Sequence, residues 1–79
     1  MGEINVPVID KERTGNRIKM LMQNKRITVS QLQLMLGMPS GILIYKWLNG
    51  THLPSTERLM QLAKVFNCHI EDIIVVQES

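Results

Sequence analysis

The 79 residues, 44% of them hydrophobic, can form one small domain with a core but leave no room for a second domain. The single cysteine excludes an intrachain disulfide framework, and no apolar run approaches the roughly 20 residues of a membrane span, so we expect a cytoplasmic protein. The formal net charge is only +2, so a preference for a charged partner must come from how the charges are distributed.

The first segment, residues 1–9, is expected to be an extended N-terminal arm. Apolar residues alternate at Ile4, Val6 and Val8, which is the pattern of a strand. Pro7 lacks a backbone N–H and restricts such a strand to the edge of a sheet. The arm is therefore expected to need a partner strand.

The remainder, residues 10–79, is expected to form one domain that begins with a helix. Asp10 can cap this helix, which would continue through about Asn24. Thr14 is the alternative start, because Gly15 weakens the first turns of the longer helix.

A second, shorter helix is expected after Thr28, whose hydroxyl can accept from the third amide along. Gln31 stands where it completes a capping box by reaching back to the Thr28 amide. One apolar face follows at helical spacing: Leu32, Met35 and Leu36. Gly37 supplies the residue without a Cβ that a left-handed helix end requires.

A third helix is expected directly after this turn, with Ser40 as its N-cap. Ile44 and Trp47 lie three residues apart and are expected to point into the core, which makes Trp47 a core residue rather than a stacking platform. Asn49 and Gly50 end the helix with turn chemistry. Two helices this short cannot stand alone in water, so the pair needs a scaffold.

The last third of the chain is expected to supply that scaffold. Ser55 can cap a helix over residues 56–66, and Asn67 can end it in the left-handed conformation. A last helical turn is expected over residues 70–74, followed by β-branched residues that favour an extended chain.

A two-stranded ribbon is expected to join the termini, with Val6–Ile9 paired against Ile74–Val76. If these segments do not pair, their side chains form an exposed apolar surface that a dimer could use. The fold class predicted from the residues is therefore all-α with this ribbon as an addition.

The charges are distributed unevenly along the chain. Residues 10–46 carry seven basic and two acidic side chains, whereas residues 47–79 carry two basic and four acidic ones. A solvated helix surface is the simpler explanation, and an electrostatic footprint for a polyanion is the alternative.

The span from about Thr14 to Val75 carries a resemblance to a known family. The matching features are the Thr28 cap, the glycine turn, the inward-facing positions of the third helix, and the segments LPS, LMQLAKVF and IEDII. In this order and spacing they resemble the lambda-repressor-like, Cro/repressor-type helix-turn-helix domains of bacteria and phages, particularly small Gram-positive regulators. The resemblance implies a compact bundle of five helices that binds double-stranded operator DNA as a homodimer, with the third helix in the major groove.

The resemblance also implies which residues contact DNA: Arg17, Thr28, Ser30, Ser40, Gly41, Ile42, Tyr45, Lys46, Asn49 and Thr51. In this family the third helix would present Gly41, Ile42, Tyr45 and Lys46 to the groove. The first three residues of the list would lie at phosphates, and the last two would touch the DNA backbone beyond the third helix. Elementary physics supports the phosphate role, because a helix amino end offers free amides and a partial positive charge. The Lys46 ammonium can serve a phosphate or a guanine edge.

The chain departs from the family where polar groups usually contact bases. Val29 stands where many relatives carry Gln, and the start of the third helix carries Gly41 and Ile42. Specificity would then come from thymine methyls or DNA shape. The leading hypothesis is a sequence-specific transcriptional repressor, with a protein interaction module or an antitoxin on the same fold as the alternatives.

Catalysis, cofactors and metals are not expected. No nucleophile is paired with a base, and 79 residues leave little room for a pocket. Cys68 and His69 are adjacent, but with only the distant His52 they make no chelating set. Cys68 is instead expected to be a small core residue.

Overall fold

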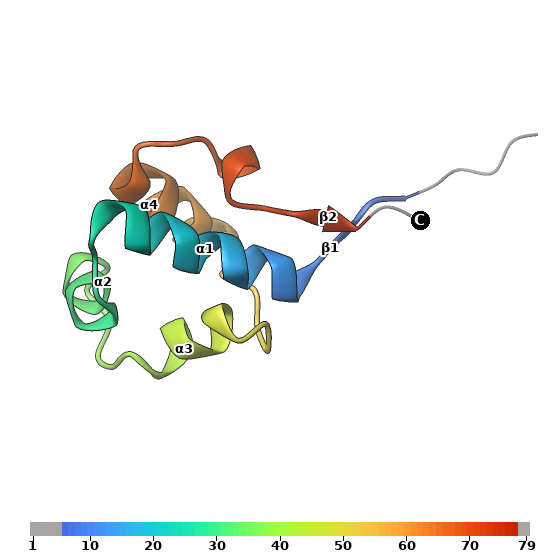
Figure 1. The fold of residues 1–79 in the computed structure, drawn as a ribbon. Coiled ribbons are helices and arrows are strands. Elements are labelled where there is room, and N and C mark those ends of the chain that lie inside the picture. Colours follow the sequence, from blue (N-terminus) through green and yellow to red (C-terminus); the bar gives the residue numbers. More distant parts are fainter. Residues whose placement is uncertain (1–5, 78–79) are drawn as a thin grey trace, which may run out of the picture.

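The computed structural model describes residues 6–77 (Figure 1). In chain order its elements are β1 (Val8–Ile9), α1 (Lys11–Lys25), α2 (Val29–Met35), α3 (Ile42–Leu48), α4 (Thr56–Phe66), the 3-10 turn η1 (Ile70–Asp72) and β2 (Val76–Gln77). The alternation predicted at Ile4 lies outside the described residues.

The first helix begins where the Asp10 cap predicts. The Arg13 amide donates to Asp10 Oδ1 at 2.9 Å, and α1 ends at Arg26, which has a left-handed backbone with φ of 55°. The alternative start at Thr14 is wrong, because Thr14 lies inside α1 and is buried. Its hydroxyl accepts from the Val75 amide at 3.0 Å, so it ties the two ends of the domain together.

The expected five-helix count is wrong. Residues 6–77 contain four α-helices, and the segment predicted as a last helical turn over 70–74 is the three-residue η1. The chain cannot stay helical beyond this turn, because the Val75 carbonyl accepts from the Asp10 amide at 2.8 Å and fixes an extended backbone there. Within the described part of the chain, no helix combines the length and the apolar character needed to cross a membrane.

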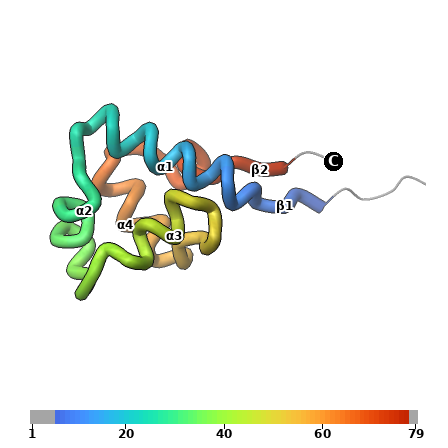
Figure 2. Tube along the Cα trace, turned by 60° about the horizontal axis from the view of Figure 1, so that its bottom comes forward, coloured from blue at the N-terminus to red at the C-terminus, as the bar shows by residue number. Residues whose placement is uncertain are grey.

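The core is shared by all four helices and by Ile73, the residue after η1. α1 packs against both α3 and α4, and α2 closes one end of this arrangement, as Figures 1 and 2 show. The largest fully buried side chains are Thr14, Ile18, Leu32, Ile44, Trp47, Leu62 and Ile73. Met35, predicted on the buried face of the second helix, is instead 56% exposed, because Leu32 and Leu36 alone cover that side of a helix only seven residues long.

The ribbon that joins the termini is present with shifted bounds. Val8 pairs with Gln77 and Ile9 with Val76 in an antiparallel register, so Val6 lies before the pairing and Ile74 lies before β2. Both strands are exposed and extend away from the helices (Figure 1). A ribbon of two residues per strand is too short to be stable alone, so the Thr14 and Asp10 bonds beside it hold it in place.

Candidate nucleic-acid interface

The second helix and the turn after it are fixed by hydrogen bonds that the sequence predicts. The Gln31 amide donates to Thr28 Oγ1 at 3.1 Å, and the Thr28 amide donates to Gln31 Oε1 at 2.8 Å, which completes the capping box. Gly37 has φ of +65°, the left-handed conformation that favours glycine. The Met38 amide then donates to the Gln33 carbonyl at 3.0 Å, so the chain leaves α2 along one defined path.

The third helix begins one residue later than predicted. Gly41 is its N-cap and Ile42 its first residue, so the prediction of Ser40 as the cap is wrong. The Ser40 hydroxyl accepts from the Ile42 amide at 3.4 Å, which is too long for a strong hydrogen bond. A Cβ at Gly41 would lie 2.9 Å from Val29 Cγ1, so a larger residue here would require the Val29 side chain to shift.

Two buried side chains and one glycine hold α3 against the scaffold. Ile44 is fully buried and Trp47 is 1% exposed, so Trp47 is a core residue as predicted. On the opposing helix, a Cβ at Gly15 would lie 2.2 Å from the Trp47 carbonyl oxygen and 2.9 Å from the Leu48 carbonyl oxygen. Helix propensity makes Gly15 a weak point of α1, but in the fold it is a place where α1 and α3 approach closely.

The opposite face of α3 is exposed. Ile42 is 65% exposed and Tyr45 is 59% exposed, and Lys46 beside them is also exposed. One aromatic hydroxyl, one ammonium and one branched alkyl group therefore project from the same short helix. Such a surface can donate to phosphates or base edges and can contact a thymine methyl group.

Four predicted backbone-contacting residues lie at the two ends of this helix pair. Thr28 and Ser30 are exposed at the amino end of α2. Asn49 and Thr51 are exposed in the loop after α3, where Asn49 Oδ1 accepts from the Thr51 amide at 2.9 Å. The Thr51 amide also donates to the Lys46 carbonyl at 2.9 Å, so the loop stays close to the end of α3.

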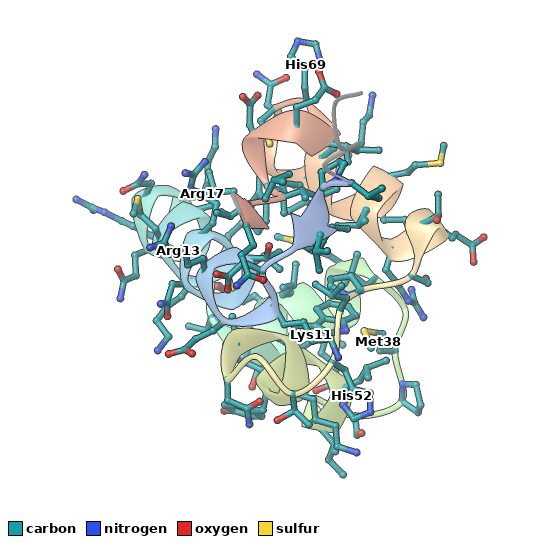
Figure 3. All side chains as sticks on the ribbon, turned by 90° about the vertical axis from the view of Figure 1, so that its right-hand side faces the viewer. Lys11, Arg13, Arg17, Met38, His52 and His69 are labelled. Atoms are coloured by element: carbon teal, nitrogen blue, oxygen red, sulfur yellow. The ribbon has the colours of Figure 1, made fainter. Side chains whose placement is uncertain are left out.

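Arg17 lies on the side of α1 that faces η1. Its Nη1 donates to the Asp72 carbonyl oxygen at 2.8 Å, which ties α1 to η1. In Figure 3, Arg13 and Arg17 extend to one side of the molecule, whereas Lys11 and His52 lie towards another. The phosphate contact of Arg17 stays a prediction, and such a contact would compete with the bond to the Asp72 carbonyl.

Lys19 is the basic residue of α1 that lies beside the α3 surface. It is exposed and lines a shallow hollow together with Tyr45, Leu48 and Asn49. Lys19 is four residues after Gly15, where α1 contacts α3. Residues four apart share one face of a helix, so Lys19 lies on the side of α1 that faces α3. Its charge is evident from the sequence, but its place beside α3 depends on the contact at Gly15, which the sequence does not reveal.

The other residues considered for chemistry do not converge. His52 lies next to α3 and His69 at the opposite end of the molecule (Figure 3). Among residues 6–77, no three His, Cys, Asp or Glu side chains come close enough to hold a metal ion. Cys68 is half-buried against the core, and burial together with the nearby Asp72 carboxylate raises the pKa of its thiol.

This fold and surface define the class of protein. It is a small helix-turn-helix domain in which one face of α3 is packed against the core and the opposite face is exposed. Comparison with protein families gives the particular family. The model of the Cro/C1-type HTH DNA-binding domain matches residues 17–79, and the chain belongs to this lambda-repressor-like family of DNA-binding regulators.

A solved structure has the same fold. The crystal structure of the DNA-binding domain of BldD matches with a TM-score of 0.71 and 9% sequence identity, covering 84% of this chain and 94% of that chain. No curated protein sequence matches. At this low identity the likeness concerns the fold alone, so the residues that contact DNA must be argued from this chain.

Proposed function

We propose that this protein is a transcriptional repressor that binds operator DNA as a homodimer, with α3 in the major groove. The observation that carries the proposal is the two-sided character of α3. Ile44 and Trp47 are buried, whereas Ile42, Tyr45 and Lys46 are exposed on the opposite side. A helix held from behind in this way can enter a groove without loss of its packing.

Phosphate contacts would flank α3 on both sides. Thr28 and Ser30 carry the amide end of α2, where helix geometry concentrates partial positive charge. Lys19, which lines a hollow together with Tyr45, and Lys46, the next residue of α3, add full charges. These contacts would fix the orientation of the domain on the duplex without conveying sequence.

Specificity would depend on apolar contact and DNA shape. Ile42 offers a methyl-lined surface that suits thymine, and Tyr45 offers one hydroxyl for a base edge or phosphate. The bidentate amide pairing of Asn or Gln with adenine has no equivalent on the exposed side of α3. Deformable or A·T-rich steps would therefore contribute to recognition.

Selection of bound duplexes from a random pool, carried out at two salt concentrations, tests the proposal. The expected result is an inverted repeat whose half-sites lie about one helical turn, roughly 34 Å, apart. Weaker recovery at the higher salt concentration is also expected, since phosphate contacts release counterions. A pool that stays random at both salt concentrations would contradict sequence-specific binding.

The exposed apolar residues favour one rival function, a protein interaction module. Ile42 and Leu43 are 65% and 39% exposed at the position where polar readers of DNA are common in the family. Ile42→Gln separates the two functions. In a DNA reader it changes the selected operator sequence, whereas in an interaction module it weakens a protein complex and leaves the selected DNA unchanged.

A further inference from the structure

A groove on the side of the molecule is not used by the proposed function. It has a volume of about 480 Å³ and lies between the end of α2 and the outer face of α4, with Met35, Met60 and Val65 among its lining residues. Met35 and Met60 are 56% and 60% exposed, and Leu36 of the buried core lines the same groove. Flexible thioether side chains of this kind suit an apolar contact with another protein surface.

Opposite charges flank Met60 and Gln61 along the outer face of α4. Glu57 lies at one end of the groove and Lys64 at the other, and both are exposed. Seven residues make two helical turns, so these two side chains share one face and lie about 10 Å apart along the axis. Met60 and Gln61 occupy the midpoint between them. The surface is therefore acidic at one end, apolar in the middle and basic at the other end.

Such an arrangement is complementary to itself after a twofold rotation. If two α4 helices lie antiparallel, with the rotation axis at the midpoint between Met60 and Gln61, each Glu57 faces the Lys64 of the other copy. The two Met60 side chains then meet at the axis, with Met35 beside them. Isologous contacts of this type are the commonest form of homodimer interface.

We propose that this groove binds a second copy of the chain, so that antiparallel α4 helices form the homodimer. The inference deepens the proposed function, because it identifies the dimer surface that an inverted repeat requires.

Hydrogen bonds already join the two walls of the groove in the single chain. Arg58 Nη1 donates to the Leu36 carbonyl oxygen at 2.9 Å and to Gln61 Oε1 at 2.8 Å, which fixes the end of α2 against α4. A second copy would therefore dock without reordering either helix, which lowers the cost of association. The groove is lined by α2 and α4 residues, so the exposed side of α3 stays free for DNA.

Analytical ultracentrifugation of the full chain without DNA tests the proposal. The expected result is a concentration-dependent monomer–dimer equilibrium. Met60→Lys brings two ammonium groups together at the axis and should weaken dimerisation at least tenfold. Met20→Lys is the matched control, because Met20 is a methionine 52% exposed on α1, outside the groove, and this variant should dimerise like the parent chain.

Charge exchange gives a sharper test of the antiparallel geometry. Glu57→Lys leaves a patch with only basic ends, and Lys64→Glu leaves one with only acidic ends, so each variant alone should be mainly monomeric. Because the two patches are complementary, an equimolar mixture should form a heterodimer, and the double exchange within one chain should dimerise like the parent. Far-UV circular dichroism checks that each variant is folded.

The results separate this inference from the function on which it rests. A chain that is monomeric up to about 1 mM, the weak end of specific binding, would overturn the proposal. A dimer that is insensitive to Met60→Lys, or variants that fail to pair when mixed, would also overturn it. Lys46→Ala should leave the equilibrium unchanged, so a failure of DNA binding alone leaves the dimer surface intact, and a loss of the dimer leaves half-site binding measurable.

Discussion

Gly15→Ala should destabilise the protein, although alanine is the better helix former. In a helix interior the replacement ordinarily stabilises by about 1 kcal/mol. Here the new Cβ would lie 2.2 Å from the Trp47 carbonyl oxygen and 2.9 Å from that of Leu48. Both oxygens belong to backbone, so no side-chain rotation relieves the overlap, and α1 must move away from α3. Overpacking costs about 1–3 kcal/mol, and so short a backbone contact belongs at the upper end of this range. After subtraction of the helix gain of about 1 kcal/mol, we expect a net loss of about 2 kcal/mol.

Thermal unfolding followed by circular dichroism measures this loss. For a domain of this size, about 2 kcal/mol corresponds to a fall in Tm of about 8–16 °C. Asn16→Ala is the control, since Asn16 is the next residue of α1 and is exposed, and this change should raise stability by about 0.5 kcal/mol. If Gly15→Ala raised Tm as Asn16→Ala does, the close approach of α1 and α3 would be refuted.

Two further predictions concern the C-terminal part of the fold. Thr14→Val removes the hydroxyl that accepts from the Val75 amide, so it should cost about 1–3 kcal/mol and speed hydrogen exchange at that amide; an unchanged exchange rate would show that the bond does not hold the ribbon. Because burial and the Asp72 carboxylate raise the pKa of the Cys68 thiol, iodoacetamide should react more slowly with the folded chain than with the urea-unfolded chain at one pH, and equal rates would contradict this.

The parts of the fold that depend on local signals could be predicted from sequence. Asp10, Thr28 and Ser55 each cap the predicted helix, because a capping side chain needs only amides within its own first turn. Asn67 ends α4 with φ of 54° for the same local reason. The inward positions of Ile44 and Trp47 followed from helical spacing.

The parts that depend on contacts between distant segments could not. The last helical turn is only η1, because α1 binds Val75 and Asp72 from more than 50 residues away. The hydrogen bond from the Arg17 guanidinium to the Asp72 carbonyl is one of these contacts, and the sequence alone does not reveal it. The place of Lys19 beside α3, which makes it a candidate phosphate contact, depends on the contact between Gly15 and α3.

The central claim is that the exposed side of α3 contacts duplex DNA, and a DNA titration across salt concentrations tests it most directly. Lys46→Ala and Lys19→Ala should each weaken binding and reduce the magnitude of the slope of log K against log salt by about one, because each removes one phosphate contact. Arg17→Ala should leave the slope unchanged, since its guanidinium binds the Asp72 carbonyl. A Lys46→Ala variant with the affinity and slope of the parent chain would contradict the account.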